Sequence, residues 1–189
     1  MQLTKIILIS FFIMLLGNIQ AECLAFKPVF ELMGKRALLL QDVAANKYKR
    51  GQSIFDASQE LKVLQQLDNN AAKWGLDNYS LMQYAQLQMD LAKHIEQYWL
   101  NLWQSNPQLA PKAGQYQDLA NLRQQIQVLD QKIYPNLAQS IQLNTCINSE
   151  IQAEFAANFK LIKGIPTTPD FSKLMVNAIL TIKLQPAKH

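Results

Sequence analysis

The stretch KRALLLQDVAANKYKRGQSIFDASQE, residues 35–60, decides how the chain folds. Its pattern predicts one helix, a short break and the beginning of a second helix. Arg36 and Lys47 are eleven positions apart, so three helical turns bring both cations to nearly the same face. Asp56 and Glu60 follow where the second helix begins. These residues indicate half of a pocket for an anion that also carries a hydroxyl group.

The rest of the sequence predicts further helices and no strand. Apolar residues recur in steps of three and four, and clusters of glycine, proline and polar residues separate the periodic segments. We expect Pro135 to kink or break the fourth helix, because proline lacks the backbone N–H. The predicted fold class is all-α, a bundle of long helices with a helical C-terminal appendage. The predicted helices cover residues 30–49, 57–74, 78–103, 119–141, 149–162 and 171–183.

Residues 1–21 have the composition of an export signal. Lys5 gives the positive start, residues 6–16 form an apolar run, and the small residue Ala21 suits a cleavage point. The run is too short for a membrane-spanning helix, so we expect no stable membrane anchor. The predicted organisation is a signal peptide at 1–21, a helical domain at 22–145 and a helical extension at 146–189 packed on the same domain.

The composition excludes several classes of function. A net charge of +4 without a dense basic cluster argues against a nucleic-acid binder. The chain has two histidines, no glycine-rich phosphate loop and no Cys-x-x-Cys pair, so we expect neither metal nor cofactor. An enzyme of this composition would act by positioning and electrostatics. Export would let Cys23 and Cys146 form a disulfide, but sequence alone does not show whether the geometry allows it.

Three segments together resemble a known family. They are residues 36–48, residues 56–60 and the run QMDLAKHIE at residues 88–96. On these segments the chain resembles the all-helical chorismate mutases, from about residue 32 to residue 137. The predicted signal peptide and Arg123 make it similar to the exported subclass, in which one longer chain holds a complete site.

The resemblance implies a chemistry that needs neither a base nor a nucleophile. These enzymes convert the dianion chorismate to prephenate by a unimolecular Claisen rearrangement, which requires grips on two carboxylates and donors at the ether oxygen where negative charge grows. By resemblance, Arg36 and Arg123 hold carboxylates, and Lys47 serves both a carboxylate and the ether oxygen. Glu96 would face that oxygen as a protonated donor, and burial beside an anion raises a carboxyl pKa in the direction needed.

The resemblance also places Asp56 and Glu60 near the ring hydroxyl of the substrate. A helix-capping box explains Asp56 and Gln59 equally well without any ligand. Gln59 stands where the family usually has arginine, and losing one charge-assisted contact corresponds to about a ten- to a hundred-fold loss of rate or affinity. Lys62, three residues on, shares the face closely enough to substitute. Ala92 stands at a substrate-binding position where some members carry a hydroxyl residue.

Two other interpretations remain beside the enzyme. The chain could be a catalytically impaired protein of the same fold that acts as a periplasmic binding or interaction protein, with Gln59 as the mark of decay. It could also be a helical periplasmic adaptor whose similarity to the family is coincidental. The leading interpretation implies chorismate as the small-molecule substrate, no cofactor, no nucleic-acid partner, a homodimer, and a location in the periplasm or outside the cell.

Overall fold

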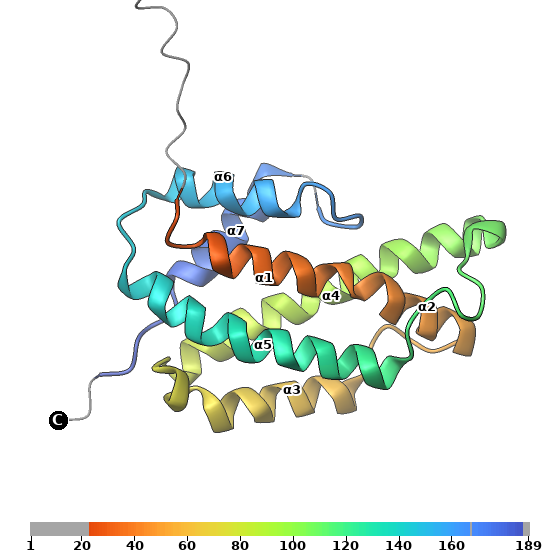
Figure 1. Cartoon of the computed structure of the whole chain (residues 1–189), viewed down its shortest axis with the longest axis horizontal. Helices are drawn as coiled ribbons and strands as arrows, with labels where there is room; N and C mark the ends of the chain where they lie inside the picture. The colour runs from red at the N-terminus through yellow and green to blue at the C-terminus, as the bar shows by residue number, and fades with distance from the viewer. Residues whose placement is uncertain (1–22, 167, 187–189) are drawn as a thin grey trace, which may run out of the picture.

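The chain folds into packed helices in the computed structural model, which describes residues 23–166 and 168–186 (Figure 1). The predicted signal peptide at 1–21 lies outside these residues. Within them the one extended pairing is an isolated bridge between Leu76 and Leu184, so the all-α prediction is confirmed. The α-helices are α1 (Lys27–Leu38), α2 (Leu40–Arg50), α3 (Ala57–Asn70), α4 (Asn78–Ser105), α5 (Leu119–Gln142), α6 (Asn148–Phe159) and α7 (Pro169–Leu180).

The first predicted helix is divided at Leu39 into α1 and α2, which corrects the single helix expected over residues 30–49. Leu39 keeps right-handed helical angles, but its N–H donates to the Arg36 carbonyl at 3.2 Å, one residue short of the α-helical spacing. The division is therefore a local tightening of the helix. α2 ends at Gly51, as predicted, because the left-handed φ of 59° lets the chain turn back there.

The long helices α4 and α5 form two walls of the bundle. Aspartates begin both of them: Asp77 accepts the Ser80 N–H at 2.9 Å, and Asp118 accepts two N–H groups in the first turn of α5. α5 continues through Pro135, so the helix is not broken at this proline. The two walls therefore run their full lengths without interruption.

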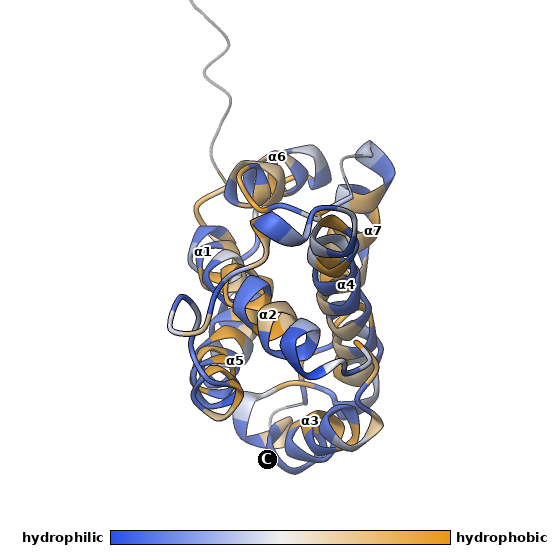
Figure 2. Cartoon of the chain, turned by 90° about the vertical axis from the view of Figure 1, so that its right-hand side faces the viewer, coloured by the Kyte–Doolittle hydropathy of each residue, from blue (hydrophilic) through white to orange (hydrophobic). Residues whose placement is uncertain are grey.

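The core lies where α1 and α2 pack against α4 and α5. Figure 2 shows the apolar faces of these helices turned towards one another, with polar residues outside. Each fully buried Leu, Ile or Phe side chain contributes about 1.5–3 kcal/mol, so this core fixes the relative positions of the four helices. Its large buried members include Phe30, Leu81, Ile95, Leu122 and Leu137.

The C-terminal helices α6 and α7 lie on the opposite side of the bundle from α3 (Figures 1 and 2). α6 packs on α1, and α7 packs on α4 and α6. A close approach is possible at Gly34, where an added Cβ would be 3.3 Å from the Asn158 carbonyl oxygen. A disulfide joins Cys23 to Cys146, whose Cα atoms are 5.8 Å apart, so the pairing that the sequence left open is present. No described helix has the length and apolar character that a membrane span requires.

Candidate active site

A cavity rich in charged side chains lies among α1, α2, α3, α4 and α5. It encloses about 650 Å³, including its opening to solvent, which suits a small-molecule ligand. Four cations and three carboxylates share the lining with apolar residues. The lining consists of Arg36, Leu40, Val43, Lys47, Ile54, Asp56, Gln59, Glu60, Val63, Met89, Ala92, Lys93, Glu96, Arg123 and Ile126.

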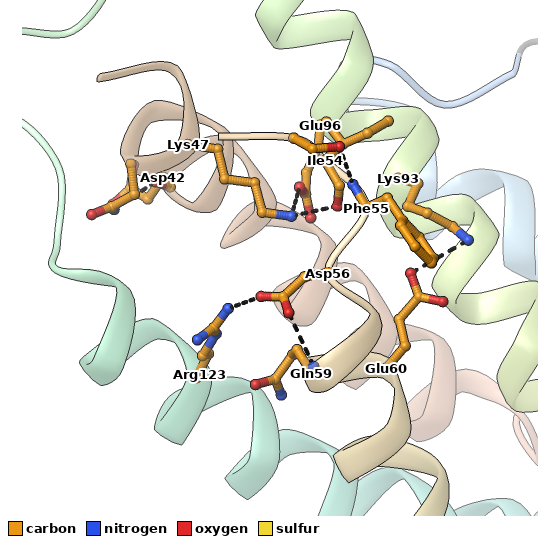
Figure 3. A network of polar contacts seen from close by, with 12 residues as sticks. Asp42, Lys47, Ile54, Phe55, Asp56, Gln59, Glu60, Lys93, Glu96 and Arg123 are labelled. Atoms are coloured by element: carbon orange, nitrogen blue, oxygen red, sulfur yellow. Dashed lines mark hydrogen bonds and ion pairs between the residues drawn. The ribbon is translucent and has the colours of Figure 1, made fainter. Parts of the chain in front are cut away.

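Lys47 and Glu96 are the most deeply buried ion pair of this cavity, with side chains only 7% and 6% exposed. The Lys47 Nζ donates to Glu96 Oε2 at 2.6 Å and to the Ile54 carbonyl at 2.7 Å (Figure 3). The turn at Gly51 brings that carbonyl back over α2. Burial raises the pKa of Glu96, and the Lys47 cation opposes this rise only in part. The pair thus sets an ammonium donor beside a carboxyl group that protonates more readily than an ordinary glutamate.

Arg36 lies in a second, partly buried ion pair between α1 and α5. Its Nε donates to Asp130 Oδ1 at 2.9 Å, and the two side chains are 12% and 17% exposed. Burial raises the pKa of Asp130, while the Arg36 cation opposes the rise. Because the contact uses Nε, the terminal amino groups of the guanidinium remain for a ligand in the cavity. The sequence patterns did not identify Asp130, which is 94 positions from its partner.

Arg123 on α5 pairs with Asp56, the residue that begins α3. The Arg123 Nη2 is 2.5 Å from Asp56 Oδ2, and the Gln59 N–H donates to Oδ1 at 3.1 Å (Figure 3). One carboxylate therefore caps the helix and also faces the cavity, so the two interpretations of Asp56 are compatible. Burial would raise the pKa of Asp56, but the Gln59 N–H and Arg123 lower it by more. Asp56 is consequently an ionised, well-held group.

Lys93 is a cavity cation that the sequence interpretation did not single out. Its Nζ lies 3.5 Å from Glu60 Oε1 and 2.9 Å from Asp90 Oδ1. A signal for it was present, because Lys93 follows Ala92 directly and is one turn from Glu96, on the face of α4 that lines the cavity. Lys93 therefore places a fourth positive charge beside the three from Arg36, Lys47 and Arg123.

All eight residues predicted to meet a ligand line this one cavity, although their roles remain predictions. They are Arg36, Lys47, Asp56, Gln59, Glu60, Ala92, Glu96 and Arg123. Lys62 is different: it is exposed and does not line the cavity, so the expectation that it could replace the missing arginine is wrong. Three residues of helix turn a side chain by about 60° from the starting direction, which here takes Lys62 out to solvent. Among residues 23–166 and 168–186, no group of three or more His, Cys, Asp or Glu could hold a metal ion.

Comparison with known proteins agrees with the resemblance found in the sequence. Residues 27–97 match the family model of chorismate mutase type II. The structure is similar to the secreted chorismate mutase from Yersinia pestis, with 25% identity and a TM-score of 0.70 over 83% of this chain and 97% of that one. Two further chorismate mutases share the fold. The one from Burkholderia phymatum has 22% identity and a TM-score of 0.64 over 82% and 93% of the two chains, and the one from Burkholderia thailandensis has 20% and 0.65 over 83% and 97%.

Proposed function

We propose that this chain, whose residues 27–97 match the family model of chorismate mutase type II, catalyses the Claisen rearrangement of chorismate to prephenate. The observation that carries the proposal is the cavity itself, to which α1, α2, α4 and α5 each contribute one cation. A unimolecular rearrangement of a dianion needs such a cavity and needs no nucleophile or proton relay. Fixed positive charges that stabilise charge developing in the transition state supply the catalysis.

The proposed roles follow the positions of the four best-placed groups. Arg36 and Arg123, which both line the cavity, bind the two carboxylates with charge-assisted hydrogen bonds. Lys47 donates to the ether oxygen, where negative charge grows as the bond breaks, and also to a carboxylate. Glu96, already within 2.6 Å of Lys47, donates to the same oxygen once it carries a proton. Substrate then replaces Glu96 as the anionic partner of Lys47.

The remaining predicted residues shape the binding of the ring. Asp56 and Glu60, at the start of α3, accept from the ring hydroxyl. Gln59 donates a neutral hydrogen bond at the position where the family usually has arginine. Ala92 gives apolar contact on the α4 side of the cavity. This set fixes the orientation of the substrate, and the cations act on its charges.

We also propose that the chain is exported and works as a homodimer in the periplasm or outside the cell. Export is supported by the composition of residues 1–21, by the Cys23–Cys146 disulfide and by the similarity to a secreted enzyme. The homodimer rests on the family resemblance, and light scattering of the purified chain tests it. Fractionation of cells expressing the full sequence, followed by sequencing of the mature N-terminus, tests export and cleavage after Ala21.

The test of the activity follows the loss of chorismate absorbance with protein that begins at Glu22. We expect turnover by the native chain and a loss of at least about a hundred-fold in kcat for Lys47→Ala, because a donor at the developing charge is removed. Lys49→Ala, an exposed lysine on the same helix, is the matched control and should keep native kinetics. Folding of each variant is checked by circular dichroism.

The Gln59→Arg variant, assayed in the same buffer, distinguishes an active enzyme from a catalytically impaired protein of the same fold. A silent native chain with an active Gln59→Arg variant would mean that the natural protein has left catalysis behind. Silence from both proteins would contradict the proposed function and turn attention to binding partners. Turnover by the native chain that Lys47→Ala leaves unchanged would contradict the proposed role of Lys47.

A further inference from the structure

We propose that Lys93 binds a carboxylate of the substrate and supplies the positive charge that Gln59 does not. The inference rests on the proposed function and adds a substrate-binding residue to it. Lys93 lines the same cavity as Gln59 and approaches α3 at Glu60, the residue next to Gln59. Figure 3 shows the Glu60 side chain between those of Gln59 and Lys93. A cation has thus been placed on α4, across from the position on α3 that lacks one.

The contacts of Lys93 leave part of its ammonium group available. The strong contact is with Asp90, at 2.9 Å, and Asp90 does not line the cavity. The contact with Glu60, at 3.5 Å, is longer than the roughly 2.7–2.9 Å of a charge-assisted hydrogen bond. Since an ammonium has three donors, Lys93 can keep Asp90 and exchange the weak Glu60 contact for a substrate carboxylate.

The surroundings keep Lys93 charged and pointed at the cavity. Its hydrogen bond to Asp90, with a further contribution from Glu60, raises the pKa of Lys93 despite partial burial. The Phe55 ring lies 5.9 Å from the Nζ and covers one side of the cation. The side chain is 25% exposed, so it is accessible to a ligand that enters the cavity.

The other charged side chains of the cavity do not offer a simpler substitute for the missing arginine. Arg36, Lys47 and Arg123 already correspond to cations that the family resemblance assigns. Lys62, the nearest lysine along α3, is exposed and outside the lining. Lys93 is therefore the lining cation without an assigned role.

The experiment compares Lys93→Met with Lys93→Arg, Lys62→Met and the double variant Gln59→Arg with Lys93→Met, measuring kcat and KM for chorismate. We expect Lys93→Met to lose about ten- to a hundred-fold in kcat/KM, since one charge-assisted contact is removed. Lys93→Arg should keep most of the native value, and Lys62→Met should match the native chain. Adding Gln59→Arg to Lys93→Met should restore activity, and by more than Gln59→Arg improves the native chain.

Each outcome decides the matter. Native turnover with Lys93→Met within about two-fold of it would overturn the inference and leave the proposed function standing. A loss that Gln59→Arg fails to restore would assign Lys93 a structural role and also overturn the inference. A native chain without turnover would reject the proposed function and this inference with it. Lys93→Gln, which keeps a polar side chain, replaces Lys93→Met if urea unfolding shows that the methionine variant is not folded.

Discussion

Glu96 links the rate of the proposed reaction to the protonation of one buried carboxyl group. Burial raises its pKa above the ordinary 4.5, with Lys47 opposing, and an anionic substrate beside it raises the pKa further. In the proposed mechanism the protonated form donates to the ether oxygen, so activity should be present below this pKa and lost as pH rises through it. We expect kcat/KM, which reports the free enzyme, to fall as pH rises through a Glu96 pKa above that of an ordinary glutamate. The fall in kcat, which reports the substrate complex, should come at a higher pH. Glu96→Gln should remove this fall, because an amide donates at every pH.

The control for the pH experiment is the same substitution at a glutamate that lies outside the cavity. Glu31 on α1 is exposed, so Glu31→Gln should keep the native profile. The proposed role of Glu96 would be contradicted by a Glu96→Gln profile that falls at the same pH as the native one. Such a result would move the titrating group elsewhere in the cavity.

At this scale the sequence identified the residues whose spacing is local or characteristic of the family. Arg36 and Lys47 were expected on one face of a single helix; they lie on α1 and α2, and both line the cavity. Glu96 lies in a recognisable run of α4. Asp130 was missed because its pairing with Arg36 spans 94 positions, and only the folded helices bring the two together. Lys93 stood in the recognised run, but a lysine on an amphipathic helix is ordinarily solvated, so its charge drew no attention.

At the scale of elements, α5 contains a proline that lowers the stability of the folded chain. Pro135 lacks the N–H that the Gln131 carbonyl would accept in an uninterrupted α-helix. Pro135 is exposed, so Pro135→Ala leaves no cavity. We expect the free energy of unfolding of this variant to be higher by about 2 kcal/mol. Alanine is favoured over proline in a helix by roughly 3 kcal/mol, and the greater entropy of the unfolded chain without proline offsets part of this gain. Urea unfolding measures the change, and kcat should stay native.

Gln139→Ala, at another exposed position of α5, is the matched control and should shift the urea midpoint little. A Pro135→Ala midpoint equal to or below the native one would contradict the expectation. It would mean that the helix bends at this point in a way that the proline favours.

The boundaries of the helices were predictable where a cap determines them and unpredictable where packing does. Asp56, Asp77 and Asp118 begin helices through hydrogen bonds within three residues, so their positions follow from the sequence. The continuity of α5 depends on Tyr134 and Leu137, the buried residues on either side of Pro135, which hold the helix against the bundle. Such packing is invisible in a propensity argument.

At the scale of the whole molecule, a disulfide joins the segment before α1 to the segment before α6, while the cavity lies elsewhere. The disulfide between Cys23 and Cys146 spans 123 positions of the chain. It ties the start of α1 to the segment before α6, on the side of the bundle away from α3 (Figure 1). The cavity instead lies against α3. From the sequence, the only ground for this pairing was the expected export. The sequence could not give the distance between the two cysteines, because that distance depends on how α1, α5 and α6 pack.

This separation predicts that the disulfide stabilises the chain without serving catalysis. Reduction, or the double variant Cys23→Ser with Cys146→Ser, should lower the free energy of unfolding by about 2–5 kcal/mol, because the long closed loop restricts the unfolded chain. Urea unfolding with and without dithiothreitol measures this, and dithiothreitol should not affect the double variant. At temperatures where the reduced chain stays folded, kcat and KM for chorismate should equal the native values. A reduced but folded chain with impaired turnover would contradict the prediction, since it would mean that the packing of α1 at the disulfide is transmitted to Arg36.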